Sequence, residues 1–214
     1  MAKITTILFD FDGTLMDTND LIISSWQHTF KIIEGKERPV SEIIPTFGEP
    51  LDYTVARLFP HLDIEEVISV YRSYHIDNFG ARINLFPGMK ELLASLKEMG
   101  YKLGLVTSRL PGTTAQGLEK YGIAEFFDAV VTAADTKKHK PDPEPILMAL
   151  EKLDSKPQES MMIGDTKHDI LCAKNAGAVS VLVGWAIAVP EESRVGENAP
   201  EHIIERAEDL FEIL

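Results

Sequence analysis

The chain contains one cysteine, few cations and no long apolar run. Its single cysteine, Cys172, cannot form an internal disulfide, and it is typical of a small buried residue in a reducing compartment. No segment approaches the roughly 20 apolar residues that a spanning helix needs, and no signal-peptide pattern precedes the first apolar run, so we expect a cytoplasmic protein. With 34 acidic and 21 basic residues, the net charge of −13 repels nucleic acid and anionic membranes, and we expect neither as a partner.

What the chain does contain is an alternation of strand and helix patterns. Its 214 residues, 44% of them hydrophobic, suffice for one core that carries a smaller insert. The expected strands are 4–9, 102–106, 129–132, 160–163 and 180–183, and the expected helices are 111–121, 143–153, 168–176 and 201–214. Strands and helices in this order predict an α/β fold, a Rossmann-like parallel sheet with helices on both faces.

Residues 16–85 interrupt this alternation. They have helical periodicity without a convincing strand pattern, and Pro87 and Gly88 break the periodicity after Phe86. We therefore expect a core of residues 1–15 plus 86–214 and an all-helical cap of residues 16–85 that moves as a lid over the sheet. Trp26, Phe30 and Tyr71 lie at helical spacing and are expected in the core of the cap.

Polar residues gather at the ends of the predicted strands. Asp10 and Asp12 come two residues apart where the first strand ends, and Gly13 allows a sharp exit. The other strand ends are followed by Thr107, Ser108, Lys140, Asp165 and Asp169. Open α/β sheets bind ligands beyond the carboxyl ends of their strands, so this edge is the candidate site.

Together these motifs resemble those of the haloacid dehalogenase superfamily of phosphohydrolases. The first motif stands here as Asp10-Phe11-Asp12-Gly13-Thr14, and Thr107, Lys140-Pro141-Asp142-Pro143 and Gly164-Asp165 with Asp169 follow in the family's order over essentially the whole chain. The resemblance implies the fold of that superfamily. It also implies Mg²⁺-dependent hydrolysis of a small phosphorylated substrate through an aspartyl phosphate.

The resemblance makes Asp10 the nucleophile and Asp12 the general acid that protonates the leaving oxygen. A calcium loop is the other interpretation of Asp10, but Gly13 falls at the fourth loop position and not at the sixth. For Asp12, the alternative is a turn residue that bonds its own backbone.

Thr107 and Ser108 would bind phosphoryl oxygens, and Lys140 would neutralise the charge that develops on the phosphoryl group. Whether Arg109 also contacts phosphate is left open by the sequence. Thr107 as a simple helix cap and Lys140 as part of a solvated basic face, together with Lys137 and Lys138, are the structural alternatives.

The same resemblance implies that Asp10, the backbone carbonyl of Asp12 and Asp165 bind the magnesium ion, and that Asp169 supports these ligands without binding the metal directly. Alternatively, Asp165 or Thr166 only caps the helix that follows.

The place of the insert resembles family members with a helical cap of the phosphoglycolate-phosphatase type, whose caps contribute specificity. Here the candidates are Gly48, within 46–50, and Arg57. Ile22 stands where the related hexose-phosphate mutases carry a His, which disfavours mutase activity. The segments 5–23, 140–145 and 168–170 resemble bacterial pyrophosphatases of the family.

Pyrophosphate is therefore the first expected substrate, and 2-phosphoglycolate or another small phosphomonoester is the second. We expect the protein to be a monomer or a weak homodimer. Two rivals come from other classes. A non-catalytic sensor of phosphorylated ligands would tolerate loss of Asp10 or Asp12, and a metal-stabilised structural protein would not need Lys140 or a lid.

Overall fold

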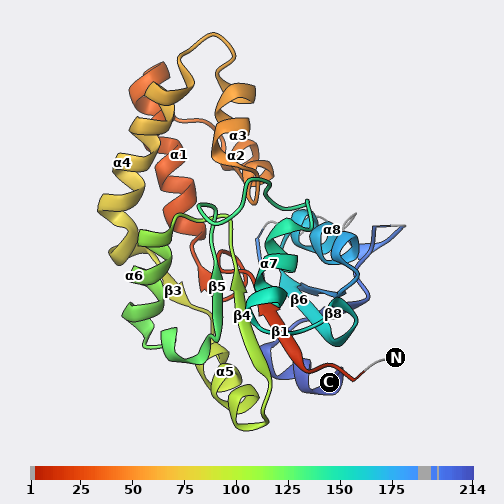
Figure 1. The fold of residues 1–214 in the computed structure, drawn as a ribbon. Helices are drawn as coiled ribbons and strands as arrows, with labels where there is room; N and C mark the ends of the chain where they lie inside the picture. Colours follow the sequence, from red (N-terminus) through yellow and green to blue (C-terminus); the bar gives the residue numbers. More distant parts are fainter. Residues whose placement is uncertain (1–2, 188–193, 197) are drawn as a thin grey trace.

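Six parallel strands form the central sheet of the protein. The computed structural model describes residues 3–187, 194–196 and 198–214, and Figure 1 shows its fold. The strand order is β5-β4-β1-β6-β7-β8. The bounds are β1 Thr6–Phe9, β4 Lys102–Val106, β5 Ala129–Val131, β6 Ser160–Gly164, β7 Val179–Val183 and β8 His202–Ile204. The predicted α/β fold is confirmed. Because β1 is hydrogen-bonded to both β4 and β6, its carboxyl end lies in the middle of the sheet edge.

Helices cover both faces of the sheet because side chains alternate along β1. Ile7 and Phe9 pack into one apolar cluster and Leu8 into the other. The first cluster lies under α5 (Met89–Glu98), α6 (Pro111–Tyr121) and the 3₁₀ helix η5 (Ala207–Glu212). The second lies under α7 (Glu144–Lys152) and α8 (Lys167–Ala176), where Cys172 is buried as expected.

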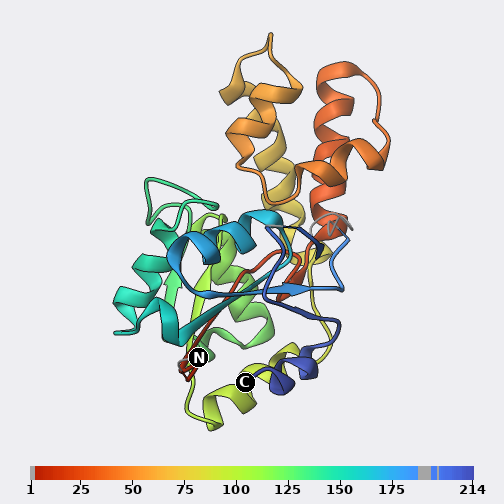
Figure 2. The ribbon, with the colours of Figure 1, turned by 90° about the vertical axis from the view of Figure 1, so that its right-hand side faces the viewer.

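The cap lies between β2 (Met16–Asp17) and β3 (Asn84–Leu85) and contains four α-helices and the short 3₁₀ helix η1 (Ile44–Thr46). The bounds of the α-helices are α1 Asn19–Glu34, α2 Val40–Ile43, α3 Leu51–Leu58 and α4 Ile64–Arg82. Figure 2 shows them rising from one end of the sheet. Trp26, Phe30 and Tyr71 belong to an apolar cluster of the cap itself, as predicted. The cap therefore has its own small core.

Two expectations about local structure were wrong. Residues 201–214 do not form a closing helix: His202–Ile204 form β8 beside β7, and a 3₁₀ helix follows. As a strand, this segment satisfies backbone groups of β7 that a helix would leave unpaired. The cap also begins and ends with an antiparallel pair of strands, Met16 with Leu85 and Asp17 with Asn84. Each of these strands has only two residues, which is too short for the alternation of polar and apolar residues that indicates a strand in the sequence.

In the part of the chain that the structure describes, no helix combines the length and apolar character that crossing a membrane requires.

Candidate active site

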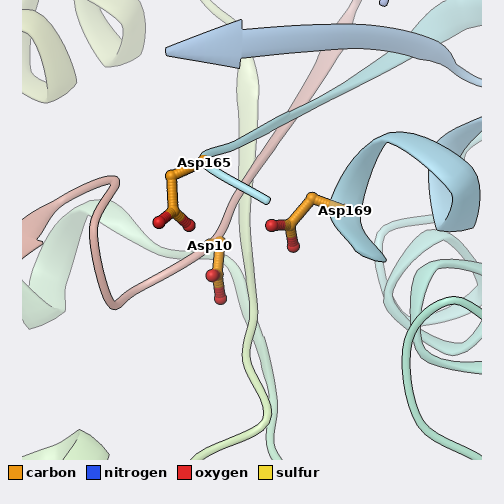
Figure 3. A group of neighbouring side chains, drawn as sticks. All are labelled: Asp10, Asp165 and Asp169. Atoms are coloured by element: carbon orange, nitrogen blue, oxygen red, sulfur yellow. The ribbon is translucent and has the colours of Figure 1, made fainter. Parts of the chain in front are cut away.

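Three buried carboxylates converge at the carboxyl end of the sheet (Figure 3). Asp10 follows β1, Asp165 follows the neighbouring β6, and Asp169 lies in the first turn of α8. One carboxylate oxygen from each lies within 4.8 Å of the other two. The parallel pairing of β1 and β6 therefore brings together residues that are far apart in the sequence.

Lys140 lies against two of these carboxylates, those of Asp10 and Asp169, and is only 6% exposed. Its Nζ lies 2.8 Å from Oδ1 of Asp10 and 2.6 Å from Oδ1 of Asp169, and it donates to the carbonyl of Val106 over 3.3 Å. Burial lowers the pKa of Lys140, but the two carboxylates outweigh burial and raise it. Lys140 is thus a permanent cation beside Asp10 and no part of a solvated face, whereas Lys138 is 69% exposed.

Asp169 is engaged by protein groups on both of its oxygens. Oδ1 accepts from Lys140, and Oδ2 accepts from the backbone N–H and the hydroxyl of Thr166 over 3.0 and 2.7 Å. Thr166 is indeed the N-cap of α8, so the capping interpretation is correct for this residue. The engaged oxygens suit Asp169 to orient Lys140 more than to bind a cation.

The donor set fits a magnesium ion. Oδ1 of Asp165 is buried without a hydrogen-bond partner among the described residues. Burial raises the pKa of Asp10 to about 7, although Lys140 lowers it, and burial next to Asp169 and Asp10 raises the pKa of Asp165. Such crowded carboxylate oxygens are what Mg²⁺ prefers. Asp10, Asp165 and the backbone carbonyl of Asp12 are the residues that would hold it.

Gly13 allows the backbone that follows Asp12 to lie directly against the carboxylate of Asp165. Its φ is +71°, and a Cβ added there would lie 2.1 Å from Oδ2 of Asp165. Any side chain at this position would therefore displace the Asp165 carboxylate from the cluster.

We expect Mg²⁺ to raise the melting temperature of the wild-type protein, because an ion that binds only the folded state stabilises it by about 2.7 kcal/mol at 100 times its Kd. The Asp165→Asn protein should melt higher than wild type without Mg²⁺, since one crowded carboxylate is gone, and should lose the Mg²⁺-dependent increase. Differential scanning fluorimetry with and without MgCl₂ measures both. Asp52→Asn, an exposed carboxylate on the wall of the same cavity, is the matched control that keeps the increase. An increase that survives Asp165→Asn would contradict this metal assignment.

Asp12 lies at the mouth of the cluster and is held by Arg109. Its side chain is 27% exposed, and its Oδ1 accepts from Nη1 of Arg109 over 2.7 Å. Both Asp12 and Asp10 line the same cavity, and the side chain of Asp10 is less exposed, at 10%.

Thr107 and Ser108 both line the cavity in front of Asp10. The N–H of Thr107 donates to the carbonyl of Val131, and its hydroxyl oxygen accepts from the N–H of Arg109 over 3.2 Å. No acceptor for the Thr107 hydroxyl hydrogen is found among the described residues, so it is available to an oxygen of a ligand. Ser108 is exposed at the same strand end.

A cavity of about 520 Å³ opens between the cap and the sheet edge. The cap supplies the loop 46–50, and Gly48 lies so close to the core that a Cβ there would be 2.7 Å from Cγ2 of Thr166. The loop therefore closes on the core in this structure. Ile22 also lines the cavity, whereas Arg57 does not: its guanidinium forms an ion pair with Glu49, 2.6 Å away, and Glu49 lines the wall.

Two polar residues of α4 that line the cavity, Arg72 and His75, were not predicted from the sequence. His75 lies between Tyr71 and Phe79, with ring centroids 5.5 and 6.2 Å away. The spacing of these three aromatic rings, i, i+4 and i+8, was the available signal that His75 faces inward. Arg72 had no comparable signal.

Comparison with known proteins agrees with this geometry. Residues 7–183 match the model of a protein family described as "Haloacid dehalogenase-like hydrolase". The chain belongs to this family. It is therefore an enzyme, a hydrolase, and the resemblance seen in its motifs is confirmed.

Named relatives cover the chain from end to end. The pyrophosphatase PpaX of Bacillus velezensis is 38% identical over 99% of this chain and 96% of its own, and that of Halalkalibacterium halodurans is 37% identical over 99% and 97%. Among solved structures, a haloacid dehalogenase-like family hydrolase from Streptococcus pneumoniae is 27% identical with a TM-score of 0.88, over 100% of this chain and 99% of its own.

Proposed function

We propose that this hydrolase is a Mg²⁺-dependent phosphohydrolase that acts through an aspartyl phosphate on Asp10, with inorganic pyrophosphate as its leading substrate. The observation that carries the proposal is the pair of carboxylates with different surroundings. Asp10 is buried against Lys140, and Asp12 lies at the mouth of the cavity against Arg109. Such a difference suits two carboxylates to two different chemical roles.

In the first step a carboxylate oxygen of Asp10 attacks phosphorus, and the bond from phosphorus to the leaving oxygen breaks. Asp12 transfers its proton to that oxygen. Lys140 and the hydroxyl of Thr107 stabilise the negative charge on the phosphoryl oxygens. Mg²⁺, when bound, would supply further neutralisation of this charge.

In the second step water attacks phosphorus of the aspartyl phosphate, and Asp12 takes a proton from that water. The bond from phosphorus to Asp10 breaks, so phosphate leaves and the carboxylate of Asp10 is restored. The closed cap loop keeps bulk water from the phosphoryl group during the first step.

The substrate rests on the likeness to PpaX pyrophosphatases over nearly the full chain. A second candidate is 2-phosphoglycolate or another small phosphomonoester, which is favoured by a cavity of about 520 Å³ that exceeds the needs of pyrophosphate alone. The presence of both Asp10 and Asp12, with Lys140 beside the first, argues against a sensor or a purely structural metal site.

The test is phosphate release with Mg²⁺ from pyrophosphate, 2-phosphoglycolate and a panel of sugar phosphates. We expect pyrophosphate to lead in kcat/KM by about tenfold or more, which equals about 1.4 kcal/mol of transition-state preference. The Asp10→Asn protein serves as the blank. A higher kcat/KM for a phosphomonoester than for pyrophosphate would be consistent with the mechanism but would contradict the proposed substrate. No phosphate release from any of these compounds would overturn the proposed function.

A further inference from the structure

Arg109 joins the general acid to the cap. Its Nη1 donates to Asp12, and its Nη2 lies 3.0 Å from Nε2 of His75 on α4. The guanidinium carbon lies 4.6 Å from the ring centroid of Phe79 and 5.4 Å from that of Phe11, and the residue is only 9% exposed. Aromatic rings this close to a cation exclude water from it, and this strengthens its attraction for an anion.

His75 is the cap residue that contacts Arg109, and the hydrogen bonds around it indicate a neutral imidazole, which does not neutralise the charge of Arg109. The hydroxyl of Ser25 donates to the carbonyl of Leu21 over 2.7 Å, so its oxygen accepts from Nδ1–H of His75, 3.2 Å away. Nε2 of His75 is then the acceptor for Arg109. Burial, together with the charge of Arg109, lowers the pKa of His75 to about 4, which agrees with a neutral imidazole. Asp12 is thus the one carboxylate paired with Arg109 among the described residues.

Arg109 lies on the side of the cavity where the leaving group must be. In-line attack by Asp10 places the leaving oxygen on the far side of phosphorus. Asp12 is the acid for that oxygen, and Arg109 contacts Asp12 and the cap at once. Atoms bonded to the leaving oxygen therefore enter the space beside Arg109.

Arg72 brings a second cation to this space from the cap. It lies on α4 three residues before His75, is exposed, and lines the same cavity. It forms no ion pair with a described carboxylate, unlike Arg57 and Arg82, which are paired with Glu49 and Asp20.

We propose that Arg109 and Arg72 bind a second anionic group of the substrate, beyond the leaving oxygen, and thereby select compounds with two anionic groups over phosphate esters with neutral leaving groups. Pyrophosphate carries a second phosphoryl group at this place, and 2-phosphoglycolate carries a carboxylate. The nearby cap residues Ile22, Trp26 and Ile76 offer apolar surface to sugar hydroxyl groups. The inference rests on the proposed function in one respect, the assignment of the leaving group to the side of Asp12.

Binding without turnover tests this inference separately from the proposed function. Isothermal titration calorimetry with Mg²⁺ present would compare methylenediphosphonate, which has two anionic groups and no hydrolysable bridge, with methylphosphonate, which has one. We expect wild type to bind the diphosphonate about tenfold or more tightly than the monophosphonate, as a charge-assisted hydrogen bond permits.

Arg72→Gln should weaken diphosphonate binding by about fivefold or more and change methylphosphonate binding by less than about twofold. Arg109→Gln should act in the same sense and more strongly, because that guanidinium is buried. Arg82→Gln, which removes a partly exposed arginine of the cap outside the cavity, is the matched control and should bind both probes as wild type does. Because Arg72 is exposed, its variant decides the question even if Arg109→Gln does not fold.

Equal losses for both probes in Arg72→Gln, or no loss, would overturn the inference, as would wild type that binds the two probes alike or binds neither. The two claims can fail independently. Selective diphosphonate binding without phosphate release from any substrate would leave the anion site standing and reject the proposed function, whereas hydrolysis without selective binding would do the reverse.

Discussion

Asp10→Asn is expected to lower kcat for phosphate release by at least about 10³-fold, in the range found when an enzyme's nucleophile is removed. An amide oxygen is too weak a nucleophile to displace the leaving oxygen. The fold should survive, because burial already raises the pKa of Asp10 to about 7 and a neutral side chain removes repulsion from Asp165 and Asp169. Steady-state phosphate release and the melting temperature measure the two effects.

Asp20→Asn is the control for this prediction. It also removes one carboxylate, but from a surface ion pair with Arg82, and should leave kcat unchanged. Mg²⁺ titration of the Asp10→Asn protein is needed because Asp10 is also a proposed ligand of the metal. Phosphate release at the wild-type rate at saturating Mg²⁺ would show that another group attacks phosphorus.

Lys140→Met is expected to reduce kcat/KM by about 10² to 10³-fold, the usual cost of one missing electrostatic contact to a transition state. It should also lower the free energy of unfolding by about 3 kcal/mol, because the carboxylates of Asp10 and Asp169 lose their shared cation inside the protein. Steady-state kinetics and urea denaturation measure these losses. Methionine keeps the length of the side chain, so the change removes the charge with little loss of volume.

Lys138→Met is the matched control from the same basic segment. Lys138 is 69% exposed and pairs with Asp142 at the surface, so its replacement should leave both kcat/KM and stability close to wild type. If Lys140→Met kept kcat/KM within about fivefold of wild type, the charge of Lys140 would not be needed at the phosphoryl group.

The residues that could be predicted lie in short motifs at strand ends. Asp10, Lys140 and Asp165 each follow a strand pattern directly, so parallel pairing alone brings them to one edge. The contact between Arg109 and His75 could not be predicted in this way, because it joins residues 34 positions apart on a core loop and a cap helix. It depends on the angle at which the cap meets the core.

Specificity was harder to predict for the same reason. The position of Arg57 just after the loop that holds Gly48 predicts a substrate contact, but Arg57 forms an ion pair with Glu49 and does not line the cavity. Arg72, one helix further along the chain, lines the cavity instead. Near the C-terminus, residues 201–214 have helical composition, yet the unpaired edge of β7 determines that His202–Ile204 form a strand.

Trapping the aspartyl phosphate would test the role of Asp10 as the nucleophile. Asp12→Ala removes the base for the second step, so with Mg²⁺ and an aryl phosphate, whose good leaving group needs no acid, the intermediate should accumulate. Acid quenching with ³²P-labelled substrate measures the phosphoryl groups bound per chain. Hydroxylamine then displaces the phosphate and leaves a hydroxamate on the phosphorylated residue, which peptide mass spectrometry locates. We predict close to one phosphoryl group per chain on Asp10 and none in the Asp10→Asn, Asp12→Ala double variant. Phosphate release with no label on Asp10, or label on another residue, would contradict Asp10 as the nucleophile.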